Sequence, residues 1–272
     1  MSLLLNASIE SGDYSKSREF LQEMIDSHPK SPQTWLNAAA LYLAQNLIPE
    51  MRCAISTALL HGRQNADILI HTSRLLIDAD MKETAARVLR YGINHLSVET
   101  GLLRQLAETS EETSDYQTAQ KAWRQYTQQA PDDPQGYLRA IKSLWALSRN
   151  AAAMELLSNA VDRFPGESEF PVLMGELQLA EGNPVSARQS FHEALNVDPE
   201  NPSILKRVSK GLIEIGELME ARGLLERSLD LYPSSEEIRS MLAETLLLQN
   251  EPQQAYELLK DIDPENIHDA SF

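Results

Sequence analysis

Two stretches of the chain share one pattern at a regular distance. Residues 12–29 read GDYSKSREFLQEMIDSHP, and residues 182–199 read GNPVSARQSFHEALNVDP. Each stretch begins with glycine and ends with proline, with an apolar residue at matching places between them. Their starts lie 170 residues apart, which is five times 34. A pattern that recurs at a multiple of one length predicts an internal repeat of that length.

Prolines give the register of this repeat. They occur at 34-residue multiples, and we define their slot as repeat position 32, so that position 1 falls on Pro32, Ala66 and every 34th residue after them. The prolines in this slot are Pro29, Pro131, Pro165, Pro199 and Pro233. Between Pro29 and Pro233, Arg63 and Ser97 fill the two slots that lack proline. Since proline stops a helix and restricts the residue before it, position 32 is expected to end the second helix of each repeat.

Position 15 predicts the turn between two helices of one repeat. Its residues are Gly12, Asn46, Asp80, Ser114, Ser148, Gly182, Gly216 and Asn250. Glycine, asparagine and aspartate tolerate a positive φ, and serine can cap a helix. A helical hairpin with a tight turn is therefore expected in every copy.

Two positions predict how the helices of a hairpin pack. Position 20 is small in most copies, which allows close approach, and it holds Ser17, Met51, Ala85, Ala119, Ala153, Ala187, Ala221 and Ala255. Position 24 is apolar throughout, which supplies bulk, and it holds Leu21, Ile55, Leu89, Trp123, Leu157, Phe191, Leu225 and Leu259. Positions 4, 7, 8 and 11 give the first helix an apolar stripe at helical spacing. Eight copies keep this register without an insertion.

Composition excludes several classes of protein. The chain has 272 residues, 42% of them hydrophobic, and a net charge of −16. Such an acidic chain is not expected to bind nucleic acid, because phosphate binding needs clustered cations. It is equally not expected to bind an anionic membrane surface. No stretch is apolar enough to enter a membrane directly. Cys53 is the one cysteine, so the chain has no internal disulfide and no cysteine-based zinc site.

The pattern resembles the tetratricopeptide repeat (TPR) family over essentially the whole chain. Matching residues are Trp35 and Tyr137 at position 4, Gly175 at position 8, Tyr42 at position 11, the six alanines at position 20, and the prolines. The resemblance implies an all-α, right-handed superhelical solenoid of about eight 34-residue helix-turn-helix repeats. Pro171, expected in the first turn of its helix, and Arg239 replace the aromatic residue at position 4.

The resemblance also implies the domain organisation. We expect one TPR solenoid domain over residues 1–272, with repeats at approximately 1–31, 32–65, 66–99, 100–133, 134–167, 168–201, 202–235 and 236–267. The first copy begins within its first helix, and the tail DPENIHDASF holds no polar capping helix. Two interpretations stay open: an excerpt of a longer protein or one whose ends a partner covers, and a short protein with fraying terminal repeats. Self-association through uncapped ends is a further possibility.

No catalytic constellation occurs in the sequence. Phosphate-binding, zinc-protease and serine-hydrolase motifs are absent, and no two of the six histidines lie three or four residues apart. We therefore expect no enzyme activity, no catalytic residue, no metal site and no cofactor.

Positions 2, 5, 6, 9, 12 and 13 of the first helices are the candidate binding positions, because family members present them to ligand in a concave groove. Predicted partner-binding residues are Asn37, Arg74, Arg104, Arg139, Lys142, Trp145, Lys206, Arg207 and Lys210. Acidic residues occur there too, and alternating charge at position 9 suggests salt-bridged rungs between neighbouring helices. Trp145 has no assigned packing role, so it is expected to anchor a ligand or to pack on the next repeat.

These residues favour a non-enzymatic scaffold or adaptor that binds a peptide or helix, acidic in part, of a partner protein. The alternative is a regulatory or targeting region of a larger enzyme or of a bacterial polysaccharide-export or envelope-assembly protein, by family analogy. Sixteen arginines against eight lysines favour a bacterial source slightly. A cytoplasmic location is expected, or a periplasmic one if the chain is an excerpt of an exported protein.

One negative result is predicted at Asn37. Some members of the family have a carboxylate clamp, a site that binds the C-termini of chaperones. It consists of an asparagine on one first helix and a Lys/Arg pair on the next first helix. Asn37 occupies a suitable slot, but the next first helix offers Asp67 and His71. We predict no detectable affinity for a chaperone C-terminal peptide in a direct titration. Micromolar binding would contradict this interpretation.

Overall fold

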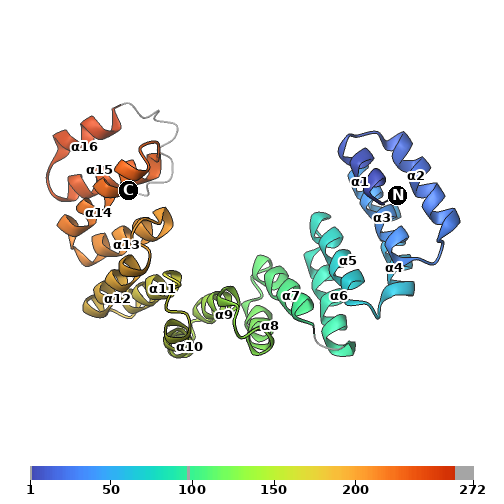
Figure 1. Ribbon diagram of the computed structural model, residues 1–272, viewed down its shortest axis with the longest axis horizontal. Helices are drawn as coiled ribbons and strands as arrows, with labels where there is room; N and C mark the ends of the chain where they lie inside the picture. Colours follow the sequence, from blue (N-terminus) through green and yellow to red (C-terminus); the bar gives the residue numbers. More distant parts are fainter. Residues whose placement is uncertain (1, 97–98, 261–272) are drawn as a thin grey trace. The chain divides into compact units, whose positions relative to one another are not determined.

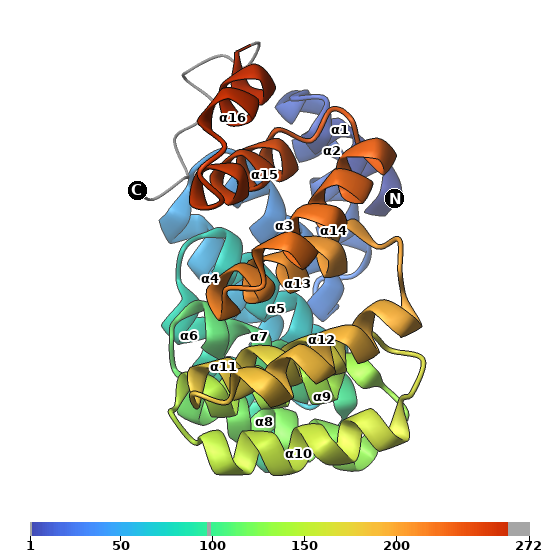
Figure 2. The same ribbon diagram turned by 90° about the vertical axis from the view of Figure 1, so that its left-hand side faces the viewer.

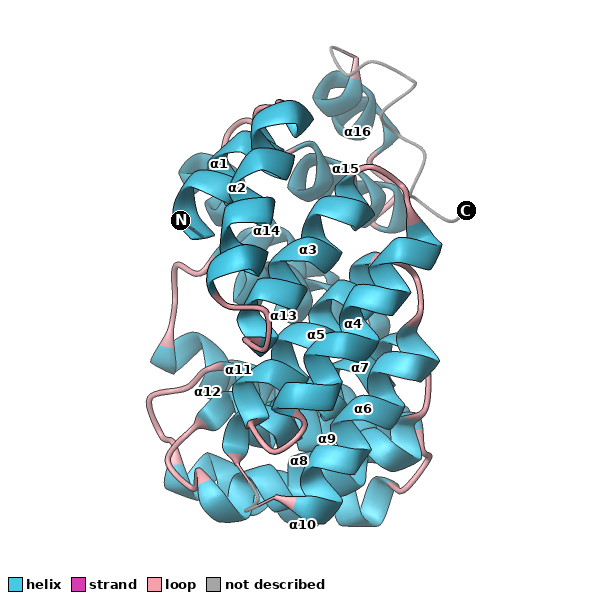
Figure 3. Cartoon of the chain, turned by 90° about the vertical axis from the view of Figure 1, so that its right-hand side faces the viewer, coloured by secondary structure: helices cyan, strands magenta, loops and turns pink. Residues whose placement is uncertain are grey.

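The computed structural model describes residues 2–96 and 99–260, which form sixteen α-helices and no strand (Figure 3). The first helices of the repeats are α1 (Ser2–Glu10), α3 (Pro32–Ala44), α5 (Ala66–Asp78), α7 (Thr100–Glu112), α9 (Pro134–Ala146), α11 (Glu169–Ala180), α13 (Pro202–Ile215) and α15 (Glu236–Leu248). The second helices are α2 (Tyr14–Ser27), α4 (Ile48–Gly62), α6 (Lys82–His95), α8 (Tyr116–Gln129), α10 (Asn150–Arg163), α12 (Pro184–Val197), α14 (Leu218–Leu231) and α16 (Pro252–Leu259). The predicted all-α solenoid of helical hairpins is confirmed.

The turn at position 15 has a left-handed backbone in all eight repeats. Its φ angle ranges from 56° at Ser148 to 88° at Gly216. The two serines were expected to tolerate this slot by capping, but Ser114 and Ser148 adopt the same left-handed conformation as the glycines. The turn therefore has the same backbone conformation whichever residue occupies it, although this conformation costs energy for a residue with a side chain.

Proline at position 32 ends the second helix as predicted. In the repeat with Pro165, α10 ends at Arg163, and Phe164 leaves the helical region with φ −124° and ψ 63°. Where Arg63 replaces proline, α4 runs one residue further, and Arg63 itself keeps helical angles of −62° and −11°. Absence of the proline does not by itself set this length, because α6, whose slot also lacks proline, ends at His95, two residues before its slot as α10 does.

The hairpin core lies at positions 20 and 24. All eight residues at position 20 are buried, and those at position 24 are buried except Leu259, which is half-buried. Phe191 shows how tight the packing is, because a Cβ added at Gly175 or Gly211 would lie 2.4 or 2.3 Å from its ring. Glycine is therefore required on both first helices that enclose this phenylalanine.

Two different side chains at position 4 donate the same hydrogen bond, to the carbonyl oxygen of the preceding proline. The indole Nε1 of Trp35 donates to the carbonyl oxygen of Pro29 at 2.7 Å. The guanidinium Nη2 of Arg239 donates to the carbonyl oxygen of Pro233, also at 2.7 Å. Arg239 therefore replaces the aromatic residue in its hydrogen bond to the preceding proline. Pro171 lies in the first turn of α11, as predicted.

The chain divides into two compact units, residues 1–147 and 148–272, which we describe separately. In unit 1, coloured blue to green in Figure 1, α1, α3, α5 and α7 pack one on the next beside their own hairpin partners. In unit 2, α11, α13 and α15 do the same, and Figure 2 shows its hairpins as successive layers. The single continuous domain stays a prediction.

Two expectations fall partly outside these helices. The tail DPENIHDASF and the proposed uncapped C-terminus lie within residues 261–272, outside the described residues. Across residues 2–96 and 99–260, no helix has both the length and the apolar character that crossing a bilayer requires.

Replacing Gly182 with alanine tests the turn at position 15. Its φ is 78°, and an added Cβ would meet no atom within 4 Å, so only backbone strain opposes the change. We expect Gly182→Ala to lower the free energy of unfolding by about 1 kcal/mol. Urea unfolding followed by circular dichroism measures it.

Gly223→Ala is the matched control. Gly223 lies inside α14, has no positive φ and has the same open surroundings. Alanine there should raise the free energy of unfolding by about 0.5–1 kcal/mol, because alanine favours helix. Equal effects of the two substitutions would refute the strained-turn explanation.

Candidate binding surface on the first helices

The predicted site residues differ in how far solvent reaches them. The exposed ones are Arg74, Arg104, Arg139, Lys142 and Lys210. Trp145, Lys206 and Arg207 are half-buried. Asn37 is only 5% exposed, and its amide contacts Gln33 and Met24. Burial leaves little of Asn37 for a ligand, so the structure favours a packing role for this residue.

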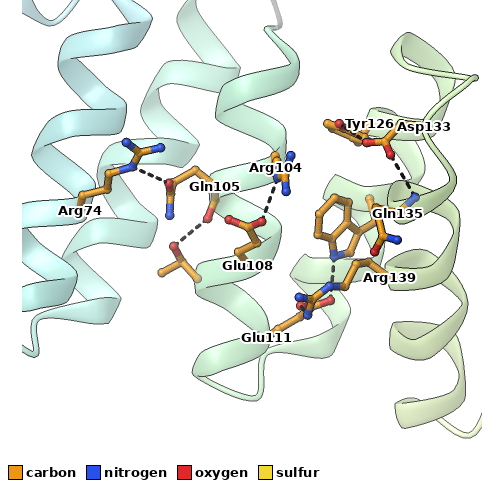
Figure 4. A network of polar contacts seen from close by, with 11 residues as sticks. Arg74, Arg104, Gln105, Glu108, Glu111, Tyr126, Asp133, Gln135 and Arg139 are labelled. Carbon is orange, nitrogen blue, oxygen red and sulfur yellow. Dashed lines mark hydrogen bonds and ion pairs between the residues drawn. The ribbon is translucent and has the colours of Figure 1, made fainter. Parts of the chain in front are cut away.

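In unit 1, polar contacts link neighbouring first helices, as Figure 4 shows. The Nε of Arg74 on α5 donates to the Oε1 of Gln105 on α7 at 3.2 Å. On α7 itself, Arg104 pairs with Glu108 at 3.0 Å, one helical turn further on. The hydrogen bond and charge of Glu108 raise the pKa of Arg104. Exposed pairs of this kind orient side chains but stabilise the fold little.

Glu111 on α7 organises a second cluster, which reaches α8 and α9 (Figure 4). Its carboxylate accepts from Trp123 Nε1 at 2.7 Å, from Arg139 Nη1 at 2.9 Å and from Ser143 Oγ at 3.3 Å. The Glu111 side chain is only 15% exposed, and three donors compensate that burial. Glu111 therefore holds Arg139 in place on the exposed face of α9.

The start of α9 is fixed by Asp133. Its carboxylate caps the helix by accepting from the backbone N–H of Gln135 at 3.0 Å, and it also accepts from the Tyr126 hydroxyl at 2.6 Å. Burial and then this hydrogen bond raise the pKa of Tyr126. The close contact needs Gly136, because a Cβ there would lie 2.7 Å from the Tyr126 ring.

In unit 2, Arg207 on α13 joins two carboxylates of α11. Its Nε and Nη2 each bond an oxygen of Glu176 at 2.7 Å, and its Nη1 pairs with Glu169. Burial alone would lower the pKa of Arg207, but the bonds and charges of the two glutamates outweigh it, so the pKa is raised. Beside it, Lys206 pairs with Glu237 of α15 at 3.0 Å. Unit 2 thus has charged contacts across three first helices.

The predicted salt-bridged rungs between position-9 residues do not occur in the described ranges; one position-9 residue, Glu176, forms an ion pair with the next first helix, and its partner is at position 6. Arg74 at position 9 bonds Gln105 at position 6 of the next repeat. Glu176 at position 9 bonds Arg207, which is again at position 6 of the next repeat. The stagger between neighbouring first helices brings these two positions together. Lys142 and Lys210, both at position 9, are exposed and form no ion pair with any residue in the described ranges.

Sequence reasoning missed the roles of Glu111 and Gln105 as partners of the predicted cations. One signal pointed to Glu111: a buried tryptophan at position 24 needs an acceptor for its indole N–H, and Trp123 finds it there. Gln105 carries no comparable signal. Within the described ranges, no cluster of three or more His, Cys, Asp or Glu side chains is arranged to hold a metal ion.

A family model described as tetratricopeptide repeat matches residues 73–271. Cellulose synthase operon protein C of Xanthomonas axonopodis pv. citri is 34% identical over 90 residues. That match covers 33% of this chain and 6% of that protein, so the chain spans a small part of this relative.

Solved structures share the fold. The C-terminal part of a TPR repeat-containing protein from Cytophaga hutchinsonii has a TM-score of 0.64 at 9% identity, covering 89% of this chain and 99% of that one. Yeast Tom70 has a TM-score of 0.57 at 16% identity, covering 94% and 55%. A thermophilic TPR protein of Thermus thermophilus has a TM-score of 0.51 at 18% identity, covering 66% and 97%. At these identities the likeness shows the fold alone.

Removing Arg207 tests the contact between α11 and α13. Arg207→Ala leaves Glu169 and Glu176 side by side without a cation, so the free energy of unfolding should fall by about 2 kcal/mol. Arg207→Lys should lose about 1 kcal/mol, because lysine does not reproduce the two-pronged bond to Glu176. Hydrogen exchange of the α11 and α13 amides, read by mass spectrometry, measures the loss.

Arg104→Ala provides the exposed counterpart. Its pair with Glu108 lies within one helix in water, so a change of no more than about 0.5 kcal/mol is expected. If Arg104→Ala accelerated exchange in α7 as much as Arg207→Ala does in α13, the distinction between the two arginines would be wrong.

Proposed function

This chain belongs to the tetratricopeptide repeat family, and from that membership we propose that its first helices bind a segment of a partner protein without catalysis. TPR families are in general scaffolds for protein–protein interaction. The proposal assigns the binding to two clusters. The α9 cluster consists of Arg139, Lys142 and Trp145, and the α13 cluster consists of Lys206, Arg207 and Lys210.

The α9 cluster combines three kinds of binding group. On α9, Lys142 lies about one turn from Arg139 and about one turn from Trp145, so the three side chains form a slanting row along the helix. Arg139 is held by Glu111, and Lys142 is exposed without an ion pair in the described ranges. Trp145 is half-buried, which leaves part of its ring for contact. A fixed arginine, an available ammonium and an aromatic surface suit a partner with an acidic and an apolar side chain.

The α13 cluster adds cations of two kinds. Arg207 is already paired with Glu169 and Glu176, so its main role is to join α11 and α13, and it is less available to a ligand. Lys210 is exposed and lies one turn from Lys206 on the same face. An acidic segment at this cluster is therefore expected to pair with Lys210, and Lys206 can exchange its surface pair with Glu237 for the ligand.

A second candidate function comes from the bacterial relative. The 34% identity with cellulose synthase operon protein C over 90 residues favours a TPR region that serves a bacterial polysaccharide-secretion or envelope assembly. In that case the partner segment belongs to another component of such an assembly. Deleting the gene in its host and measuring exported polysaccharide tests this alternative, and unchanged export would remove it.

Affinity capture from the native host tests the α9 cluster. The variant carries Arg139→Gln, Lys142→Glu and Trp145→Ala; glutamine keeps a donor for Glu111 and so protects the fold. We expect a partner that the wild-type chain captures to be lost with this variant and to bind at least tenfold more weakly in a direct titration. Raised salt should weaken the wild-type complex.

A control charge reversal lies on a second helix of the same unit. Lys121→Glu changes an exposed lysine of α8 and should leave capture unchanged. In unit 2, Lys206→Glu with Lys210→Glu tests the α13 cluster and spares Arg207. If the α9 variant captured the same proteins as the wild type, the α9 cluster would not be the binding site.

A further inference from the structure

A groove on the second helices of unit 1 is separate from the clusters above. The helices α4 and α6 both pack on α5, whereas no two second helices stand among the closely packed helix pairs of the described residues. The space left between α4 and α6 is an open groove of about 490 Å³. We call it the α4/α6 groove.

Each helix presents one face to this groove. On both helices the lining residues follow the spacing i, i+3, i+4 and i+7, which defines a single helical face. They are Ser56, Leu59, Leu60 and Arg63 on α4, and Thr84, Arg87, Val88 and Tyr91 on α6. Leu69 of α5, nearly fully buried, forms the floor. The groove therefore has an apolar centre that continues into the core.

Leu60 is unusual for its place in the repeat. It is 73% exposed on the surface of α4. Its repeat position, 29, is polar in the other second helices that the structure describes there: Asp26, Asn94, Gln128, Asp162, Asn196 and Asp230. Leu60 therefore adds to the apolar lining of the groove a side chain that the repeat pattern does not require at this slot, and it does so beside Leu59, Val88 and Tyr91.

Arg63 stands at a slot where most repeats have proline, and it lies in the lining of the groove. The longer α4 keeps Arg63 helical and aligned with Leu60 and Ser56. Arg87 is the other charged residue of the lining, and no acidic residue lines the groove. The groove therefore carries positive charge on a chain whose net charge is −16, and this local charge favours an acidic ligand.

A comparable groove in unit 2 has the opposite charge. The space beside α10 and α12 has a volume of about 410 Å³ and an apolar lining that includes Phe164 and Val197. Its charged lining residues are Asp162, Glu167 and Glu193, all acidic. Grooves between second helices therefore recur in the fold, and the arginines belong to the α4/α6 groove in particular.

We propose that the α4/α6 groove binds a short amphipathic helix of a partner protein, with apolar residues on one face and acidic residues beside them. The groove walls are helices whose backbone groups are already bonded within the helix, so they offer no edge to an added strand. Recognition must therefore use side chains, as when a helix lies in a groove. Leu59, Leu60, Val88 and Tyr91 receive the apolar face, and Arg63 and Arg87 pair with the carboxylates.

Three synthetic peptides of about 14 residues test this proposal. The probe contains alanine, leucine and glutamate, with leucines on one helical face and glutamates beside them. The second peptide has lysine in place of each glutamate, and the third has the leucines of the probe scattered around the helix. Fluorescence anisotropy with the full chain should show the probe binding at micromolar concentrations and at least tenfold more tightly than the other two.

Substitutions in the groove locate the binding. Leu60→Asp places at position 29 the residue that Asp26, Asp162 and Asp230 show to be compatible with the helix, and it should weaken probe binding about tenfold or more. Arg63→Glu should weaken it and reduce its dependence on salt. The control is Met219→Asp, which removes a methionine that is 75% exposed on α14 and should leave the dissociation constant unchanged.

The outcomes separate this groove from the clusters on the first helices. In the α9 variant Arg139→Gln/Lys142→Glu/Trp145→Ala the probe should still bind, and adding Leu60→Asp should weaken that remaining binding about tenfold, so binding at the α9 cluster does not affect this test. Equal binding of the glutamate and lysine peptides would overturn the proposal. An unchanged affinity of Leu60→Asp for the probe, with helical circular dichroism intact, would also overturn it. So would a wild-type dimer that Leu60→Asp converts to monomer, because a second copy of the chain would then be the occupant of the groove.

Discussion

Close approach of the two helices in each hairpin is the constraint on which the structure depends. The residue at position 20 is fully or nearly fully buried in every repeat, and it is small in all but one. The exception, Met51, is fully buried in a core cluster that also contains Ala38 and Ala39. Phe191 packs against Gly175 and Gly211, where an added Cβ would clash with its ring. Large side chains thus lie beside small ones, as expected for a close-packed interior.

This close packing determines where free surface remains. Within each unit, first helices pack on the first helices of the next repeat, and their exposed positions become linked by polar contacts across repeats. Second helices stand further apart, so grooves remain between them, lined by arginine in one case and by carboxylates in another. A chain of repeated hairpins thus offers two kinds of surface. One has side chains positioned by their neighbours, and the other is an open groove that a helix of another protein can enter.

Most of the fold could be predicted from the sequence because its determinants are local. The left-handed turn, the helix-ending proline and the small residue at position 20 act within one repeat, and each is visible in the register of 34. The site was less predictable because it depends on distances between repeats. The pairing of position 9 with position 6 follows from the stagger of neighbouring helices, which no single repeat specifies. The burial of Asn37 likewise depends on contacts with Gln33 and Met24, and its family slot alone suggests an open position.

Departures from the repeat pattern differ in what the structure does with them. Arg239 replaces an aromatic residue and recovers the same hydrogen bond to the preceding proline, so this departure is compensated within the fold. Arg63 and Leu60 are not compensated in this way. Arg63 keeps helical backbone angles at the end of α4, Leu60 stays exposed, and both line the same groove. In a repeat protein every copy supplies a reference for the others, so a residue that breaks the pattern and gains no internal contact is evidence for an external one. By this criterion the α4/α6 groove is distinguished from the equivalent surfaces of the chain, because its two exceptions lie together and complement one kind of ligand.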